Sequence, residues 1–351
     1  MKNQNKKIQE LITASRSEIA EEIVNLQYAK NPEAWEKYGP AGKKLSIRDA
    51  GYHLPFLTEA IVSEDDSIFR EYVTWVKKLF TGLNLPQDTM KVTLECTREV
   101  LQHYLSEEMA KTTNHFIESG LEQLKKEVTD DKPFINKADY LGEAAYQYIN
   151  ALLNGDRMQA GEIIMQTVES GKPVRDIYIH IFQKSQYEVG RLWLSNKITV
   201  AKEHFCSAAT QQIMSQLYPY IFTTDRIGKT FVAACIGGEL HEIGIRMVAD
   251  FFEMEGWDTY YLGANSPTSS IVQAIEDKNA NLLGLSVAMP YHRNLLREAI
   301  DEIRQETNNK IKIMVGGNAM NTHDDAWRNF RADAYAPDAI KAIEIAKQLL
   351  N

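Results

Sequence analysis

A histidine with an acidic residue two positions before it and a glycine three positions after it is the most chemically suggestive feature of the sequence. These residues are Glu239, His241 and Gly244. An imidazole that binds a metal usually has its second ring nitrogen held by a carboxylate or a carbonyl, and Glu239 is placed to supply a carboxylate. Glycine leaves room for a bulky group close to the backbone. The motif predicts a metal site with His241 as the ligand.

The residues around this motif indicate which elements position it. The apolar run 231–236 predicts a buried strand, and the amphipathic segment 245–254 predicts a helix. His241 therefore lies on a strand-to-helix turn. In an open parallel sheet such turns lie at the carboxyl ends of the strands, where ligands bind.

Two further motifs are expected at the same edge of the sheet. Ser286 lies within the apolar run 282–287, and Gly316 and Gly317 follow the run 312–315. A serine at a strand end can hydrogen-bond a buried ligand. Paired glycines let a ligand lie against backbone that side chains would otherwise block.

These motifs, in this order, resemble the cobalamin-binding motif of methionine synthase, cobalamin mutases and cobalamin photoreceptors. The resemblance implies that His241 replaces the cofactor's own base as the lower ligand of cobalt. It also implies a set of further cofactor-binding residues, which here are Glu239, Gly244, Ser286, Gly316 and Gly317. The sequence departs from the family at Ala288, where a leucine or threonine is usual.

Simpler roles for these histidines remain open. His241 could be a turn histidine that Glu239 or Glu242 holds, without any metal. His292 and His323 are expected on loops at the same sheet edge, and we expect them to be solvated rather than in contact with the corrin.

The composition excludes several classes of function. The 351 residues have room for two or three domains, and 44% hydrophobic with 25% charged residues is typical of soluble globular proteins. A net charge of -9 without clustered Lys and Arg argues against a nucleic-acid surface. Because no apolar run could span a membrane and the start is polar, we expect a cytoplasmic protein without membrane contact. The three cysteines have no metal or redox spacing.

The spacing of apolar residues predicts an α plus α/β protein with three domains. Residues 1–130 are expected to form an all-helical domain of globin size, and 138–220 a four-helix bundle. Residues 229–351 alternate strand and helix, which predicts a flavodoxin- or Rossmann-like, five-stranded parallel sheet. The helices expected in the first domain are 8–26, 47–62, 68–80, 90–105 and 109–124, and the strands of the sheet are 231–236, 258–262, 282–287, 312–315 and 334–336.

The bundle contains a second motif: Trp193, then nine residues, then Glu203 and His204. Thr199 is a suitable N-cap, so the last two residues fall in the first turns of the bundle's last helix. The spacing resembles the adenosylcobalamin photoreceptors, whose bundle covers the upper face of the corrin and whose tryptophan packs on the adenosyl group. Those that regulate transcription commonly have a histidine after the tryptophan, where this chain has Leu194.

The first domain has aromatic segments, at 35–42, 48–54 and 72–75, similar to the helical domain of the photocobilins. In that family a bilin lies close to the corrin. The resemblance implies that Tyr52 and His53 contact biliverdin or another bilin, at its pyrrole nitrogens or propionates. The alternative is that His53 is a core histidine with a hydrogen-bond partner.

The combined resemblance implies a cobalamin-binding photoreceptor and not an enzyme. Light would cleave the cobalt–carbon bond of adenosylcobalamin, and loss of the adenosyl group would change domain packing and oligomeric state. We therefore expect a homo-oligomer with light-dependent assembly, which signals through self-association or a separate output protein. The alternatives are a corrinoid methyl carrier of a methyltransferase and a cobalamin storage module. A tryptophan above cobalt would obstruct methyl delivery, which favours the sensor.

Overall fold

The computed structural model describes residues 2–127, 131–321 and 326–350. The chain forms two compact units. The first takes residues up to 130 with the short segment 194–196, and the second takes the remainder. Among the described residues, no helix combines the length and the apolar character that crossing a membrane requires.

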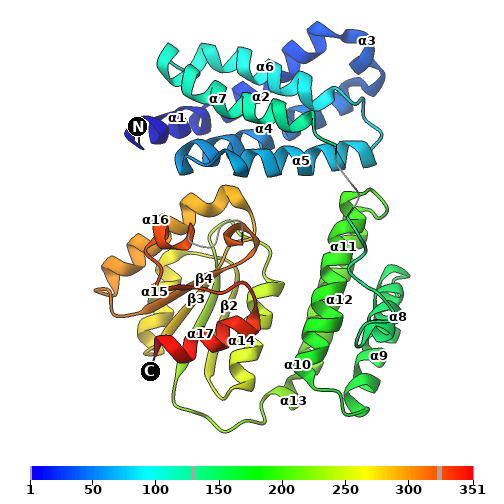
Figure 1. Cartoon of the computed structure of the whole chain (residues 1–351), viewed down its shortest axis with the longest axis vertical. Helices are drawn as coiled ribbons and strands as arrows, with labels where there is room; N and C mark the ends of the chain where they lie inside the picture. Colours follow the sequence, from blue (N-terminus) through cyan, green and yellow to red (C-terminus); the bar gives the residue numbers. More distant parts are fainter. Residues whose placement is uncertain (1, 128–130, 322–325, 351) are drawn as a thin grey trace. The chain divides into compact units, whose positions relative to one another are not determined.

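The first unit is all-helical, as the sequence predicts (Figure 1). One predicted boundary is wrong, because the expected helix 8–26 is divided at Ser15. The apolar spacing continues through the break, and isoleucines of the helices on both sides of it are buried. The long helices are α1 (Lys2–Ala14), α2 (Arg16–Lys30), α4 (Gly39–Ser63), α5 (Asp66–Gly82), α6 (Thr89–Tyr104) and α7 (Glu107–Leu124), with the short α3 (Pro32–Trp35) between α2 and α4.

The second unit begins with the predicted helical bundle. Its third helix is continuous from α10 through a π-helical stretch, η2, to α11. The last helix, α12, begins after Thr199, whose side chain accepts a hydrogen bond from the backbone N–H of Lys202 and so caps it. The bundle elements are α8 (Gly142–Leu153), α9 (Arg157–Glu169), α10 (Val174–Ile177), η2 (Tyr178–Gln183), α11 (Lys184–Leu194) and α12 (Val200–Gln216). The short α13 (Tyr218–Ile221) follows.

The rest of the second unit is a five-stranded sheet with helices on both faces, which confirms the predicted fold class (Figure 1). The strand order is β2-β1-β3-β4-β5, and every neighbouring pair is parallel. The strands are β1 (Thr230–Ile236), β2 (Asp258–Ser266), β3 (Leu282–Ser286), β4 (Lys312–Gly316) and β5 (Ala334–Tyr335). The helices are α14 (Ile243–Met254), α15 (Thr268–Asp277), α16 (Arg293–Glu306) and α17 (Ala339–Leu349).

From Phe231 to Ile236, successive side chains of β1 are apolar and point to opposite faces of the sheet, which explains why helices cover both faces. Phe231, Ala233 and Cys235 belong to a core with α14, α17 and the bundle. The residues between them point to the opposite face and pack with α15 and α16. The bundle and the sheet therefore share one hydrophobic core.

Candidate functional site

Strand register brings the predicted site residues to one edge of the sheet. Cys235 at the end of β1 pairs with Ser286 of β3, and Ser286 pairs with Gly316 of β4. Ser286 is buried. The loop with His241 leaves β1 at this edge, so the three sequence motifs of the last domain meet where parallel sheets bind ligands.

The carboxylate of Glu239 holds His241 in one orientation. Its Oε1 accepts hydrogen bonds from His241 Nδ1 at 2.5 Å and from the His241 backbone N–H at 3.0 Å. Glu239 is completely buried, whereas the side chain of His241 is 62% exposed. Because Nδ1 is engaged, Nε2 is the nitrogen available to a ligand, as in metal sites where a carboxylate orients the histidine.

Electrostatics keep Glu239 ionised. Burial alone would raise the pKa of Glu239, but hydrogen bonds from His241, His292 and two backbone amides together hold that pKa well below its usual range. In turn, the hydrogen bond to Glu239 raises the pKa of His241, against burial, and the nearby charge of Glu203 raises it further. The site therefore stabilises a carboxylate beneath an imidazole whose proton competes with a metal.

His292 is a part of the site that the sequence interpretation missed. The expectation that it is solvated is wrong, because it is 6% exposed and its Nδ1 lies 3.1 Å from Glu239 Oε2. It ends η3 (Pro290–His292), directly after β3. The sequence did offer one signal: His292 lies in the loop that follows β3, and β3 is the neighbour of β1 in the sheet. The prediction for His323 lies outside the described residues.

The glycines of the motif differ in what they accommodate. A Cβ on Gly317 (φ +95°) would lie 2.3 Å from the carbonyl oxygen of Val287, and one on Gly316 would lie 2.9 Å from that of Ala336. Only glycine fits this close backbone approach. Gly244, by contrast, has no atom within 4 Å of where a Cβ would stand, so the space beside the start of α14 is open.

The residues of the bundle motif lie at the end of α11, which contains Trp193, and at the start of α12, which contains Glu203 and His204. Glu203 accepts hydrogen bonds from Ser207 Oγ at 2.9 Å and pairs with His204 Nδ1 at 2.5 Å. The side chain of His204 is 74% exposed. Trp193 is half-buried in the last turn of α11. Glu203 is near enough to influence the pKa of His241, so the start of α12 belongs to the same side of the unit as the histidine.

A polar contact joins the loop of His241 to the bundle. Glu242 accepts a hydrogen bond from Gln211 of α12 at 3.0 Å, and also from the Tyr261 hydroxyl and the Ala264 N–H of β2. Burial would raise the pKa of Glu242, but these hydrogen bonds lower it overall. The residue after the candidate ligand is thus bonded to both the bundle and the sheet.

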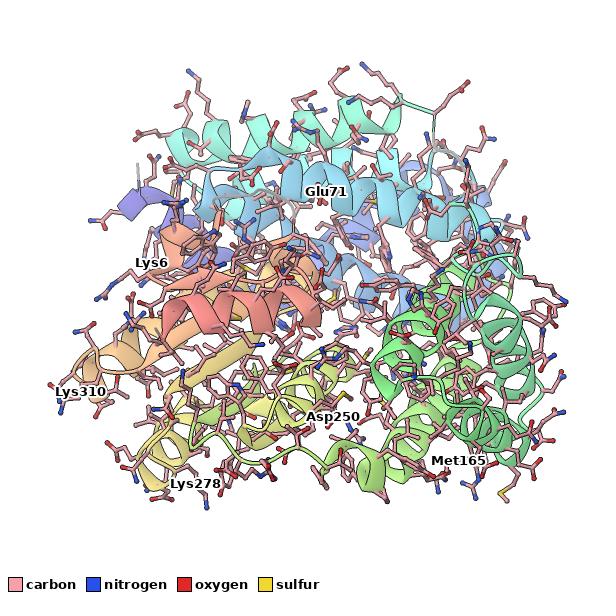
Figure 2. The ribbon with its side chains drawn as sticks, turned by 60° about the horizontal axis from the view of Figure 1, so that its bottom comes forward. Lys6, Glu71, Met165, Asp250, Lys278 and Lys310 are labelled. Atoms are coloured by element: carbon pink, nitrogen blue, oxygen red, sulfur yellow. The ribbon has the colours of Figure 1, made fainter. Side chains whose placement is uncertain are left out.

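A second polar contact lies deeper along α14. Arg246 donates to Gln211, to Ser215 Oγ at 2.6 Å and to the Tyr218 hydroxyl. One turn later, the buried Asp250 (labelled in Figure 2) accepts a hydrogen bond from the Tyr178 hydroxyl of η2 at 2.7 Å. Hydrogen bonds that require fixed geometry therefore connect the bundle to α14 within a largely apolar interface.

In the first unit, the two residues predicted to contact a bilin have different surroundings. Tyr52 is 54% exposed, and the guanidinium groups of Arg16 and Arg48 lie 5.9 Å and 6.0 Å from its ring centroid. His53 is buried, with Nδ1 2.6 Å from the Tyr72 hydroxyl, and burial lowers its pKa to about 4. His53 is therefore a neutral core histidine with a partner, and its contact with a bilin stays a prediction.

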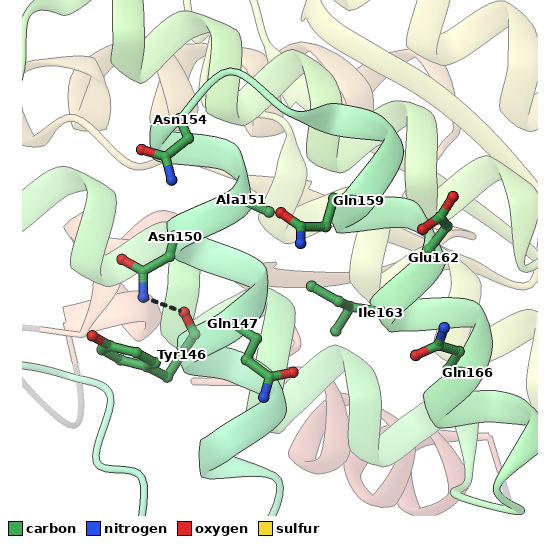
Figure 3. A pocket seen from close by; sticks show the side chains of 9 residues that line it. All are labelled: Tyr146, Gln147, Asn150, Ala151, Asn154, Gln159, Glu162, Ile163 and Gln166. Atoms are coloured by element: carbon green, nitrogen blue, oxygen red, sulfur yellow. Dashed lines mark hydrogen bonds between the residues drawn. The ribbon is translucent and has the colours of Figure 1, made fainter.

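A cavity in the bundle lies away from this site. It has a volume of about 430 Å³ and lies between α8 and α9 (Figure 3). Side-chain amides dominate its lining, and none of the predicted site residues contributes to it. One of these amides, on Asn150, donates to the carbonyl of Tyr146 at 2.8 Å. The cavity offers no ligand set for a metal.

The geometry at the sheet edge fits a cobalamin. A protein nitrogen that replaced the cofactor's own base would have to be accessible and fixed in direction, and His241 presents Nε2 from an exposed ring held by a buried carboxylate. The open space at Gly244 and the close-packed backbone at Gly317 suit a large ring and its tail.

Comparison with protein families agrees with this geometry. Residues 229–344 match the model of the B12 binding domain, and residues 145–218 match a second model of the same description. Residues 1–128 match the model of phycobilisome proteins.

The individual relatives include corrinoid proteins. The chain is 28% identical over 166 residues to dimethylamine corrinoid protein 1 of Methanosarcina mazei, covering 47% of this chain and 74% of that protein. It is 21% identical to methionine synthase of Mycobacterium tuberculosis over 62% of this chain and 19% of the synthase. The solved monomethylamine corrinoid protein of Methanosarcina barkeri superposes with a TM-score of 0.53 at 21% identity, covering 60% of this chain and all of that one. Residues 145–218 and 229–344 therefore resemble B12-binding domains, and the findings support a cobalamin-binding protein that is similar to corrinoid proteins.

Proposed function

We propose that the chain binds cobalamin between the bundle and the sheet, with His241 as the lower ligand of cobalt. The observation that carries this proposal is the hydrogen bond between the buried Glu239 and Nδ1 of an otherwise exposed histidine. When bound, the cofactor supplies a cobalt–carbon bond that can be broken and re-formed. The protein supplies the ligand, its orientation and a covered site.

Each candidate residue would have a separate role in binding the cofactor. Glu239 fixes the tautomer of His241, so that Nε2 carries the free electron pair. Ser286, Gly316 and Gly317 line the edge of β3 and β4, where the displaced nucleotide tail would lie. Trp193, Glu203 and His204 would shape the upper side of the pocket.

The relatives favour one function for this cofactor, a corrinoid methyl carrier that works beside a separate methyltransferase. The chain is similar to a dimethylamine corrinoid protein over 47% of its length and to a monomethylamine corrinoid protein over 60% of its length. In this role the chain binds the cofactor and a partner enzyme performs the transfer.

The first 128 residues favour a different function, a light sensor that binds adenosylcobalamin. Their match to phycobilisome proteins is not explained by methyl transfer. A bilin such as biliverdin would bind near Tyr52, where Arg16 and Arg48 supply cations for its propionates. Light would remove the adenosyl group beside Trp193, and the bundle would move on α14, changing self-association or the contact with an output partner.

One experiment separates the two functions. The purified chain is loaded with adenosylcobalamin or methylcobalamin, with and without biliverdin, and its size is measured by chromatography in the dark and after green light. A sensor binds the adenosyl form more tightly and changes its size in light. A carrier prefers the methyl form, and its size is the same in both conditions. A sensor is rejected if illumination releases the adenosyl group without any change in size.

A further inference from the structure

The carboxylate below the candidate ligand is held by two histidines, not one. Oε1 of Glu239 accepts from His241, and Oε2 accepts from His292 Nδ1 at 3.1 Å. Oε2 also accepts from the backbone N–H groups of Ala288 at 2.8 Å and Met289 at 2.9 Å. The ligand loop after β1 is therefore joined, through one carboxylate, to the loop after β3.

This arrangement fixes the position of the carboxylate. An ionised carboxylate only accepts hydrogen bonds, so each imidazole must present Nδ1–H to it. Glu239 is completely buried, and His292 is 6% exposed, so solvent cannot replace a lost donor without a rearrangement. The ring of His292 also packs against the ligand loop, since a Cβ on Gly238 would lie 3.3 Å from its Nε2.

We infer that His292 is a positioning residue for the cobalt ligand: it anchors Glu239 so that the carboxylate directs Nε2 of His241 to the corrin. The inference rests on the proposed ligation of cobalt by His241. Without the donor from His292, Oε2 is held by two backbone amides alone. The carboxylate can then rotate within its pocket, and Nε2 of His241 loses its fixed direction. Changes to residues that orient a metal ligand typically weaken metal binding by about 10- to 100-fold.

The competing explanation is that His292 only fills space beside Tyr291, whose ring it contacts edge-on at 4.3 Å between centroids. Two variants separate the explanations. His292→Phe keeps an aromatic ring but removes the donor. His292→Asn loses the ring but keeps an N–H close to the position of Nδ1. His103→Phe, at an exposed histidine of the first unit, is the matched control.

Each variant is produced with ¹⁵N-labelled histidines, so that a protein nitrogen is distinguished from the cofactor's own base. It is loaded with cobalamin, reduced to the cobalt(II) form and examined by electron paramagnetic resonance, with affinity measured by equilibrium dialysis. The wild type and His103→Phe are expected to show the doublet splitting of an axial ¹⁵N histidine nitrogen. His292→Phe is expected to lose most of this signal and to bind cobalamin about 10- to 100-fold more weakly. His292→Asn is expected to restore both. Thermal melting and circular dichroism of the apo chain identify a variant that has failed to fold.

Three results would overturn the inference. In the first, folded His292→Phe keeps the wild-type splitting and affinity. In the second, His292→Asn is as defective as His292→Phe, which would assign the role to the ring. In the third, His292→Phe does not fold, and the folded His292→Asn protein loses the splitting. If the wild type itself shows no doublet from a labelled histidine nitrogen, then the proposed ligation by His241 has failed, and that result is distinct from the other three.

Discussion

The contact between Asp250 and Tyr178 predicts an unusual dependence of stability on pH. Burial of Asp250 raises its pKa to about 6 from an ordinary value of 3.8, although the hydrogen bond from Tyr178 and the charge of Arg246 oppose this. Between these two values the folded chain binds more protons at this carboxyl than the unfolded chain. Its contribution to stability is therefore greatest below pH 4 and is lost as the pH rises towards 6 and above.

The magnitude follows from the shift. A difference of about two pKa units at about 1.4 kcal/mol per unit gives roughly 3 kcal/mol lost at neutral pH, most of it between about pH 4 and pH 6. Asp250→Asn retains an oxygen that can accept from Tyr178 and removes the charge. We expect this variant to be more stable than the wild type by about 2 kcal/mol at pH 7.5, and the gain to shrink to about 1 kcal/mol or less by pH 4.5.

Hydrogen exchange in urea is a suitable assay, because the chain has two units and overall unfolding is not a two-state process. Peptides from α14 and η2 report the contact directly. Wild type and variant are compared at the same pH, so that other titrating groups cancel. Tyr178→Phe is the control that removes the donor and should destabilise the contact at pH 7.5. A gain for Asp250→Asn that does not vary with pH, or a loss at pH 7.5, would refute the reasoning.

Three further substitutions test the site. Gly244→Ala should leave the melting temperature of the apo chain unchanged or raised, because its Cβ meets no atom, and should weaken cobalamin binding in dialysis. Gly317→Ala should lower the stability of the second unit by at least about 2 kcal/mol in thermal melts, because the φ of Gly317 is positive and an added Cβ would overlap the backbone of Val287. Equal stability of Gly244→Ala and Gly317→Ala would contradict this account. Glu242→Gln replaces one of two accepting oxygens by an NH2 group, which must then face a donor, either the Gln211 amide or the Ala264 N–H. We expect this to cost about 1 to 2 kcal/mol and to speed hydrogen exchange at the start of α14, whereas unchanged exchange would rule out a structural role for the contact.

The sequence predicted the sheet because its signals are local. Apolar runs bounded by turns mark β1, β3 and β4, and the motif residues follow directly after them, so their meeting at one edge is a consequence of parallel pairing. Thr199 was recognisable as a cap for the same reason.

The features that sequence reasoning missed depend on tertiary contacts. His292 reaches Glu239 only because β3 lies beside β1 and a tight turn at Pro290 directs the ring inward. The bond from Tyr178 to Asp250 depends on how the bundle packs against α14, and no periodicity in either helix reports that. The break at Ser15 leaves the apolar spacing of the two helices intact, so periodicity alone could not reveal it.

The central claim is that a protein imidazole, that of His241, binds cobalt from below. Labelling all histidines with ¹⁵N tests it directly in the cobalt(II) form of the loaded chain, since only a protein nitrogen carries the label. The account predicts that the axial-nitrogen triplet of the unlabelled protein becomes a doublet in the labelled protein, and that this doublet disappears in labelled His241→Ala. A triplet that persists in the labelled protein would show that the cofactor's own base is the ligand, and would contradict the account.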